Sequence, residues 1–217
     1  MLKQIIAVIG CCMLFAAQNK APERTVQGNT ITSEHDPKLR IRLPESVHFV
    51  GADRWVLYGI ADCELHAFVE ADEHKNVQAL YWVQFEGYLP ERPDLHHTYD
   101  SARHATIGDL DFYVDTWPRS NGEKTESGSD REHIDAHIRA KGYKIPADMM
   151  YVRLVHLLDA GKRKELMIIY GEGLASTGFA AADLREGGKA SGQWAALEKG
   201  LIERAKKKIA LEEISKP

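Results

Sequence analysis

Two histidines spaced four residues apart, His133 and His137, are the clearest candidates for chemistry in this sequence. Residues with this spacing lie on one face of a helix, so both imidazoles could bind a single metal ion such as zinc. The sequence lacks the zincin pattern, which needs Glu directly after the first His, where this chain has Ile134. Histidine pairs on short charged helices are more often solvated, which is the alternative. A complete site would also need a third ligand from elsewhere, for example Asp130, His96, His97 or His104.

A second polar cluster lies in and beside the proline-containing segment 90–103. It consists of Asp94, His96, His97, Asp100 and His104. Loops held by a sheet commonly carry functional groups, and histidine can act there as an acid or a base. Exposed loops are polar in any case, so solvation is again the alternative. The sequence therefore predicts a polar site here but not its geometry.

Other reactive side chains are predicted to have structural roles. Asp109 and Asp111 fall on one face of an alternating stretch, which predicts solvent-facing carboxylates rather than an acid–base pair. Cys63 shares a strand face with Leu65 and other apolar residues, which predicts a buried, unreactive thiol. The chain contains neither a glycine-rich nucleotide-binding pattern nor the G-x-S-x-G pattern of serine hydrolases.

Aromatic residues occupy two opposite registers of the predicted elements. One set is Tyr81, Phe85, Phe112 and Trp194, and the other is Trp82, Tyr88, Tyr113 and Trp117. A curved sheet closed by the last helix would form a concave site for a small apolar ligand. Ordinary core packing with half-exposed cross-strand pairs is the alternative.

The elements that must position these residues are mainly strands. Alternating or continuous apolar residues predict strands, which fall at 39–43, 47–50, 54–60, 62–71, 77–89, 106–117, 151–158 and 165–170. Turn-forming residues at 51–53 separate two of them. Short polar connections predict two hairpins, 62–71 with 77–89 and 151–158 with 165–170, the latter near the middle of the sheet.

Helices are predicted late in the chain. A capping box at Ser129 begins a short helix that should stop at Gly142. A helical turn is predicted at 180–185, and an apolar stripe predicts a final helix at 193–214. The predicted fold is therefore α+β, with an antiparallel, curved sheet covered by a C-terminal amphipathic helix and one shorter helix.

The first residues predict export. Residues 1–17 combine Lys3 with a 13-residue apolar run, which is typical of a signal peptide and too short for a membrane span. The sequence ending at Cys11 also resembles a bacterial lipobox, which would make Cys11 the lipidated residue. Residues 18–37 are polar and predict a tether, and 38–217 predict one globular domain. The expected location is extracytoplasmic, either periplasmic or secreted, with membrane contact only through the leader or a lipid anchor.

Composition excludes one broad class of function. The formal net charge is -4 and the isoelectric point is about 6.2. Proteins that bind nucleic acid carry clusters of Lys and Arg, so no nucleic-acid partner is expected. The one basic cluster, 206–208, is flanked by glutamates, which indicates a solvated helix face.

These features favour an exported, non-catalytic protein that binds a small apolar ligand or a protein partner. One alternative is a metal-dependent or hydrolytic extracytoplasmic enzyme that uses the loop and helix histidines. Another is a structural envelope lipoprotein, in which residues 18–37 act as a spacer from Cys11.

Overall fold

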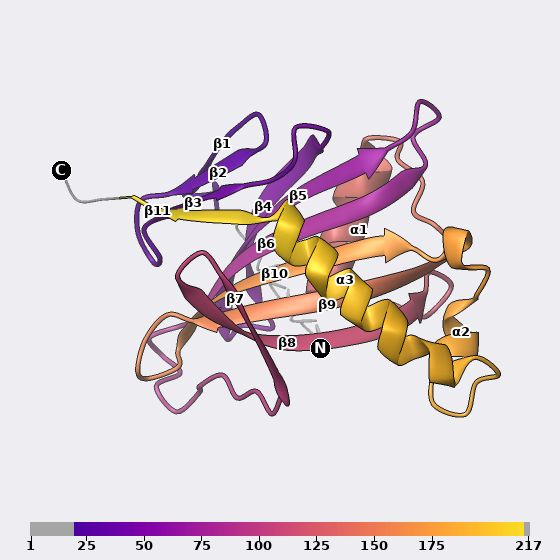
Figure 1. Ribbon diagram of the computed structural model, residues 1–217. Coiled ribbons are helices and arrows are strands. Elements are labelled where there is room, and N and C mark those ends of the chain that lie inside the picture. The colour runs from indigo at the N-terminus through magenta and orange to yellow at the C-terminus, as the bar shows by residue number, and fades with distance from the viewer. Residues whose placement is uncertain (1–19, 215–217) are drawn as a thin grey trace, which may run out of the picture.

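Two antiparallel sheets form the framework of the computed structural model, which describes residues 20–214 (Figure 1). The larger sheet has seven strands, in the spatial order β4 (His48–Leu57), β5 (Ala61–Ala71), β6 (Val77–Tyr88), β10 (Lys164–Gly173), β9 (Asp148–Leu157), β8 (Leu110–Ser120) and β7 (Arg103–Ile107). The smaller sheet has the order β1 (Thr25–Gln27), β2 (Thr30–Ser33), β3 (Leu39–Arg42) and β11 (Ala210–Glu213). The predicted hairpins correspond to β5–β6 and β9–β10, and the latter lies near the middle of the seven-stranded sheet, as predicted.

The helices are α1 (Asp130–Ala140), α2 (Ala181–Leu184) and α3 (Trp194–Lys208), with short 3₁₀ helices at Ala175–Thr177 and Ser191–Gln193. Helix α1 begins as predicted, because the Ser129 side chain accepts a hydrogen bond from the backbone N–H of Glu132. It is followed by Gly142, whose φ of 76° favours glycine. The predicted α+β fold, with a C-terminal helix and a shorter one, is confirmed.

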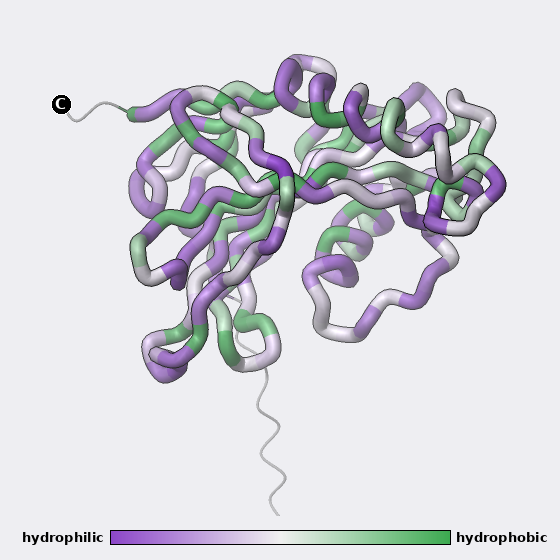
Figure 2. The backbone as a smooth tube through the Cα atoms, turned by 60° about the horizontal axis from the view of Figure 1, so that its bottom comes forward, coloured by the Kyte–Doolittle hydropathy of each residue, from purple (hydrophilic) through white to green (hydrophobic). Residues whose placement is uncertain are grey.

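Two hydrophobic cores lie on opposite faces of the seven-stranded sheet. One face packs against α3 and the smaller sheet, and this core includes Tyr81, Ile41 and Leu201. The other face packs against α1, whose Ile134 and Ile138 are fully buried. Figure 2 shows these two helices on opposite sides of the sheet. Strand alternation therefore sends neighbouring residues into different cores.

Strand β4 corrects one prediction, because 47–50 and 54–60 are not separate strands. The chain continues through 51–53 and pairs with β5, with a β-bulge between Phe49 and Gly51. The bulge absorbs the turn-forming residues without ending the strand. Glycine at position 51 avoids a steric conflict there, since a Cβ atom would lie 2.5 Å from Nδ1 of His137.

Two other element boundaries differ from the prediction. The expected strand at 106–117 is a hairpin, β7–β8, because Gly108 takes a φ of 59° and turns the chain. Asp109 therefore lies in the turn and not in a row with Asp111. The expected helix at 193–214 ends at Lys208, and residues 210–213 pair with β3 as strand β11.

Residues 18–37 also differ from the predicted tether. Within this segment, β1 and β2 form a hairpin that belongs to the smaller sheet. Ile31 is fully buried in the core, and Ser33 is also buried. Because the strands are only three and four residues long, their alternation was too short to detect in a polar segment.

The predicted leader 1–17, including Cys11, lies outside the described residues. None of the helices formed by residues 20–214 has both the length and the apolar composition of a membrane span.

Candidate functional site

The two helix histidines face strand β4. The Nδ1 atom of His133 lies 2.7 Å from Oδ2 of Asp53, and Nε2 of His137 lies 3.9 Å from the same oxygen. The His133 ring also stacks on Trp55, with 3.9 Å between ring centroids. Burial lowers the pKa of His137. The carboxylate beside the two histidines therefore belongs to Asp53. Asp53 was not among the third ligands that the sequence suggested.

The loop cluster is dispersed in the structure. Asp94, His96 and Asp100 are exposed. His104 is also exposed and lies beside Asp111, with 3.1 Å between Nδ1 and Oδ2. Only His97 is buried, with 6% of its surface exposed. The predicted polar site is therefore reduced to one member, whose partners come from the sheet.

His97 lies beside two glutamates from neighbouring strands, Glu86 on β6 and Glu165 on β10. These two residues are direct cross-strand partners, so their side chains leave the same face of the sheet. Ligand atoms of the three residues all lie within 4.8 Å of one another, and the only such group of three found among residues 20–214 is this one. The loop and the two central strands thus form a compact donor set, which we call the Glu–His–Glu cluster.

Tyrosines and an amide fix the positions of the Glu–His–Glu cluster. The Tyr99 hydroxyl donates to Oε2 of Glu165 at 2.6 Å, and the Gln84 amide donates to Glu86 at 3.1 Å. The His97 ring stacks on Tyr88, with a centroid distance of 4.5 Å. Its Nδ1 lies 3.0 Å from Glu165, whereas its buried Nε2 has no protein partner. Nδ1 is therefore the ring nitrogen that faces Glu165 and the rest of the cluster.

Burial sets the ionisation of the cluster. It raises the pKa of Glu165 to about 7, against the lowering effect of the Tyr99 hydrogen bond. Burial and the nearby Asp130 raise the pKa of Glu86. Burial lowers the pKa of His97 to about 4, so its imidazole is neutral at neutral pH. A neutral imidazole keeps the lone pair that metal coordination needs.

Both glutamates border buried strands in the sequence, which is a usable signal for a partnered carboxylate. Glu165 precedes the apolar run 166–169, and Glu86 follows the buried run 79–85. A carboxylate that shares the inward face of a buried strand is costly unless it has a partner. Cys63 pairs opposite Glu86 on β5 and is fully buried. Burial raises the pKa of this thiol, which agrees with its predicted structural role.

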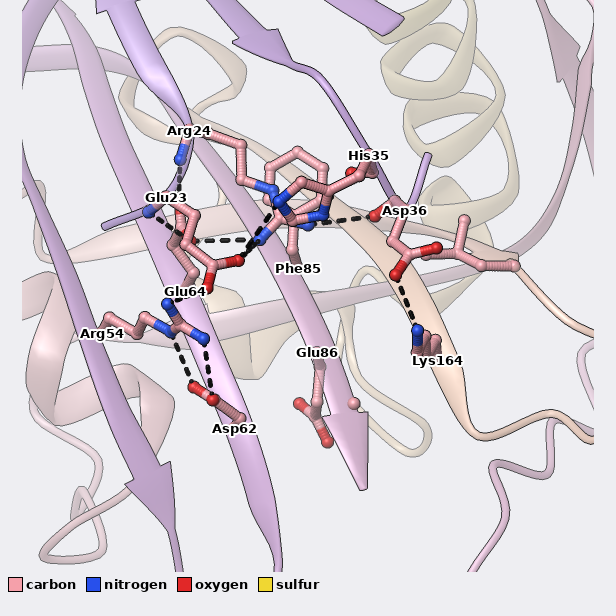
Figure 3. Close-up of a pocket in the computed structure, with 12 residues that line it drawn as sticks. Glu23, Arg24, His35, Asp36, Arg54, Asp62, Glu64, Phe85, Glu86 and Lys164 are labelled. Atoms are coloured by element: carbon pink, nitrogen blue, oxygen red, sulfur yellow. Dashed lines mark hydrogen bonds and ion pairs between the residues drawn. The ribbon is translucent and has the colours of Figure 1, made fainter. Parts of the chain in front are cut away.

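A small charged pocket near the start of the described chain has a different character (Figure 3). Its volume is about 130 Å³, and its charged groups are largely paired with each other. These pairs are Arg24 with Glu64, Arg54 with Asp62 and Lys164 with Asp36. The Arg24 guanidinium also lies 4.2 Å from the centroid of the Phe85 ring. This ion-pair network attaches the N-terminal segment to the sheet.

Comparison with known proteins gives no match for this chain among protein-family models, curated proteins or solved structures. Function therefore has to be argued from the chemistry of the sites themselves.

Proposed function

We propose that this protein binds a divalent transition-metal ion, with zinc as the best match, through Glu86, His97 and Glu165. The observation that carries the proposal is the convergence of two carboxylates and one buried imidazole within 4.8 Å. In this proposal the metal lies between the two central strands and the 89–102 loop. Of its three ligands, only His97 was also a candidate site residue in the sequence analysis.

The donor set matches zinc chemistry. Zinc takes nitrogen from His and oxygen from Glu, and three protein ligands leave a fourth position for water or substrate. Calcium and magnesium favour all-oxygen sets, which a buried imidazole does not supply. Zinc–ligand bonds are about 2.0–2.2 Å long, so ligand atoms in a tetrahedral site lie about 3.4 Å apart. The three side chains, whose ligand atoms lie within 4.8 Å of one another, therefore have to move closer together to bind an ion.

Charge balance supports a bound cation. The two glutamates together would carry two negative charges when ionised, and within residues 20–214 no Lys or Arg forms an ion pair with either one. Arg153, whose positive charge acts to lower the pKa of Glu165, is paired with Asp115 at 2.7 Å. A divalent ion would neutralise both carboxylates at once, which a single proton cannot do.

Zinc titration of the chelator-treated protein tests the proposal, with stoichiometry from native mass spectrometry and affinity from calorimetry. We expect one zinc per chain. His97→Phe preserves a ring that can stack on Tyr88, and Glu165→Gln preserves side-chain shape. Each should weaken zinc binding on the order of 100-fold, because losing even an outer-shell partner costs 10–100-fold. Circular dichroism would verify that both variants remain folded.

Two controls distinguish this site from the helix histidines. His74→Ala removes an imidazole whose side chain is 74% exposed, and zinc affinity should be unchanged. A double His133→Ala, His137→Ala variant should also retain zinc. If the double variant loses zinc binding and His97→Phe retains it, the zinc site lies instead at the α1 histidines and Asp53. Wild-type protein that takes up no zinc would exclude both locations.

Export and lipidation stay predictions, because they depend on residues 1–17. Expression with the native leader, followed by intact-mass measurement of the mature chain, would test them. A mass corresponding to cleavage near Ala17 supports a secreted form. A lipid adduct at Cys11 that Cys11→Ser removes supports an anchored form, and an uncleaved chain contradicts both.

A further inference from the structure

A groove on the α1 face of the seven-stranded sheet lies outside the Glu–His–Glu cluster. Its volume is about 290 Å³, which is at the small end for ligand sites. Its apolar lining comes from Trp82, Trp117, Met167 and Ile169. Trp82 and Ile169 are direct cross-strand partners on β6 and β10. The groove therefore has an apolar wall built on the central strands.

The aromatic part of this wall is fixed in place. The Trp82 indole N–H donates to the Gln84 side chain at 2.9 Å. Trp117 stacks on Tyr151 with an interplanar angle of 21° and 5.6 Å between centroids. Tyr151 is itself only 2% exposed. Because these side chains are already ordered, binding a small apolar group does not carry the entropic cost of ordering them.

Two of the three arginines that line the groove are already paired. Arg131 donates to Asp135 at 2.8 Å, and it also donates to the Tyr151 hydroxyl. Arg153 donates to Asp115 at 2.7 Å. These two guanidiniums therefore have internal partners and need no ligand.

Arg119 and Asp130 differ, because each has a buried polar atom without a partner in the described structure. The unpartnered atoms are Nε of Arg119 and Oδ1 of Asp130. The Arg119 guanidinium donates to the backbone carbonyl of Lys124 at 3.3 Å, and it lies 3.9 Å from Glu123, which is also paired with Arg185. Buried donors and acceptors without partners are costly. One cavity thus offers an unsatisfied cationic donor, an unsatisfied anionic acceptor and an apolar wall.

We propose that this groove binds a small zwitterion with an apolar body, and specifically an amino acid with an apolar side chain. The ligand carboxylate pairs with Arg119, the ammonium pairs with Asp130, and the side chain packs against Trp82 and Trp117. Charge complementarity selects this class, because an uncharged apolar ligand would leave both polar atoms buried and unpaired.

Calorimetry with L-phenylalanine as the probe tests the proposal on the full chain in the presence of EDTA. The chelator ensures that heat does not come from the amino acid removing a metal. We expect saturable binding of one ligand per chain. Two matched compounds each lack one charge: 3-phenylpropanoate has no ammonium, and 2-phenylethylamine has no carboxylate. Each should bind at least tenfold more weakly, in line with about 1.4 kcal/mol or more per lost charged contact.

Two variants connect each ligand charge to its residue. Arg119→Gln should weaken binding of 3-phenylpropanoate but not of 2-phenylethylamine, and Asp130→Asn should have the opposite effect. Arg103→Gln, which alters a half-exposed arginine of β7 outside the groove, should leave all affinities unchanged. This crossed pattern is specific to the proposed orientation. Equal effects of both variants on both compounds would overturn it.

A measurement on the wild-type protein avoids dependence on variant folding. Saturation with L-phenylalanine should shift the indole N–H resonances of Trp82 and Trp117 in an NMR spectrum. Those of Trp55 and Trp194, which do not line the groove, should stay in place. Absence of saturable binding, or shifts only at Trp55 or Trp194, would refute the proposal. Zinc binding at the Glu–His–Glu cluster is tested separately, by His97→Phe and Glu165→Gln, which change no residue that lines the groove.

Discussion

Glu64 is the residue for which the structure gives the most quantitative prediction. Its side chain is 2% exposed and accepts hydrogen bonds from the backbone N–H groups of Glu23 and Arg24, at 2.9 and 2.8 Å. His66 lies 2.9 Å away and the Arg24 guanidinium 3.1 Å away. Burial alone would raise the pKa of Glu64, but these partners outweigh it and lower the pKa from 4.5 to about 2. We predict that Glu64→Gln makes stability less dependent on pH.

The magnitude follows from the linkage between protonation and folding. A carboxylate whose pKa is lowered in the folded state stabilises the protein above its unfolded pKa, and this contribution is lost as pH falls towards the folded pKa. A drop from 4.5 to about 2 corresponds to about 3 kcal/mol at neutral pH. About 0.8 kcal/mol of this is lost at pH 4, and about 2 kcal/mol at pH 3.

Urea denaturation of wild type and Glu64→Gln in EDTA, at several pH values from 7 to 3, measures this difference. The gap in unfolding free energy should be largest at pH 7 and should narrow by about 2 kcal/mol at pH 3. Glu34→Gln, which changes an exposed glutamate of the same region, should follow wild type at every pH. A gap for Glu64→Gln that stays constant from pH 7 to pH 3 would refute the reasoning.

Three further predictions concern buried contacts. Gly51→Ala should destabilise the protein by about 1–3 kcal/mol in urea denaturation, because its Cβ would lie 2.5 Å from His137; wild-type stability would show that α1 can move away. Gly171→Ala should cost at least as much in the same assay, since its Cβ would lie 2.6 Å from the Tyr151 ring, which is buried and stacked. Cys63 should react with a thiol reagent only after denaturant is added, because it is fully buried; rapid reaction of the native protein would contradict its position.

Sequence patterns correctly predicted the elements whose pattern is local and extends over many residues. The hairpin formed by β5 and β6 has strands of 11 and 12 residues, so its alternation is unambiguous. Helix α1 carries its own start signal at Ser129. By contrast, β11 follows α3 directly, and Ile209 fits both the helical stripe and an extended chain. Its identity as a strand depends on pairing with β3, which lies far away in the sequence.

The candidate site was only partly predictable for a similar reason. His97 could be singled out because histidine in a loop is conspicuous. The sequence does not show which of the neighbouring histidines, His96 or His97, is buried, because both lie in the same polar loop. Glu86 and Glu165 become neighbours only when β6 and β10 pair in one particular register. A one-residue slip would place one of them on the opposite face, so no local pattern could specify the pair.

The smaller sheet links the beginning of the described chain to its end, since β3 pairs with β2 on one side and with β11 on the other. During synthesis, β1, β2 and β3 emerge from the ribosome before the other described strands, but β3 has no partner on its second edge until residues 210–213 follow. Strand pairings between distant segments are slow to form, and an unpaired edge can associate with other chains. The smaller sheet is therefore complete only once β11 has been made, and until then the free edge of β3 is open to chaperone binding or to misassembly.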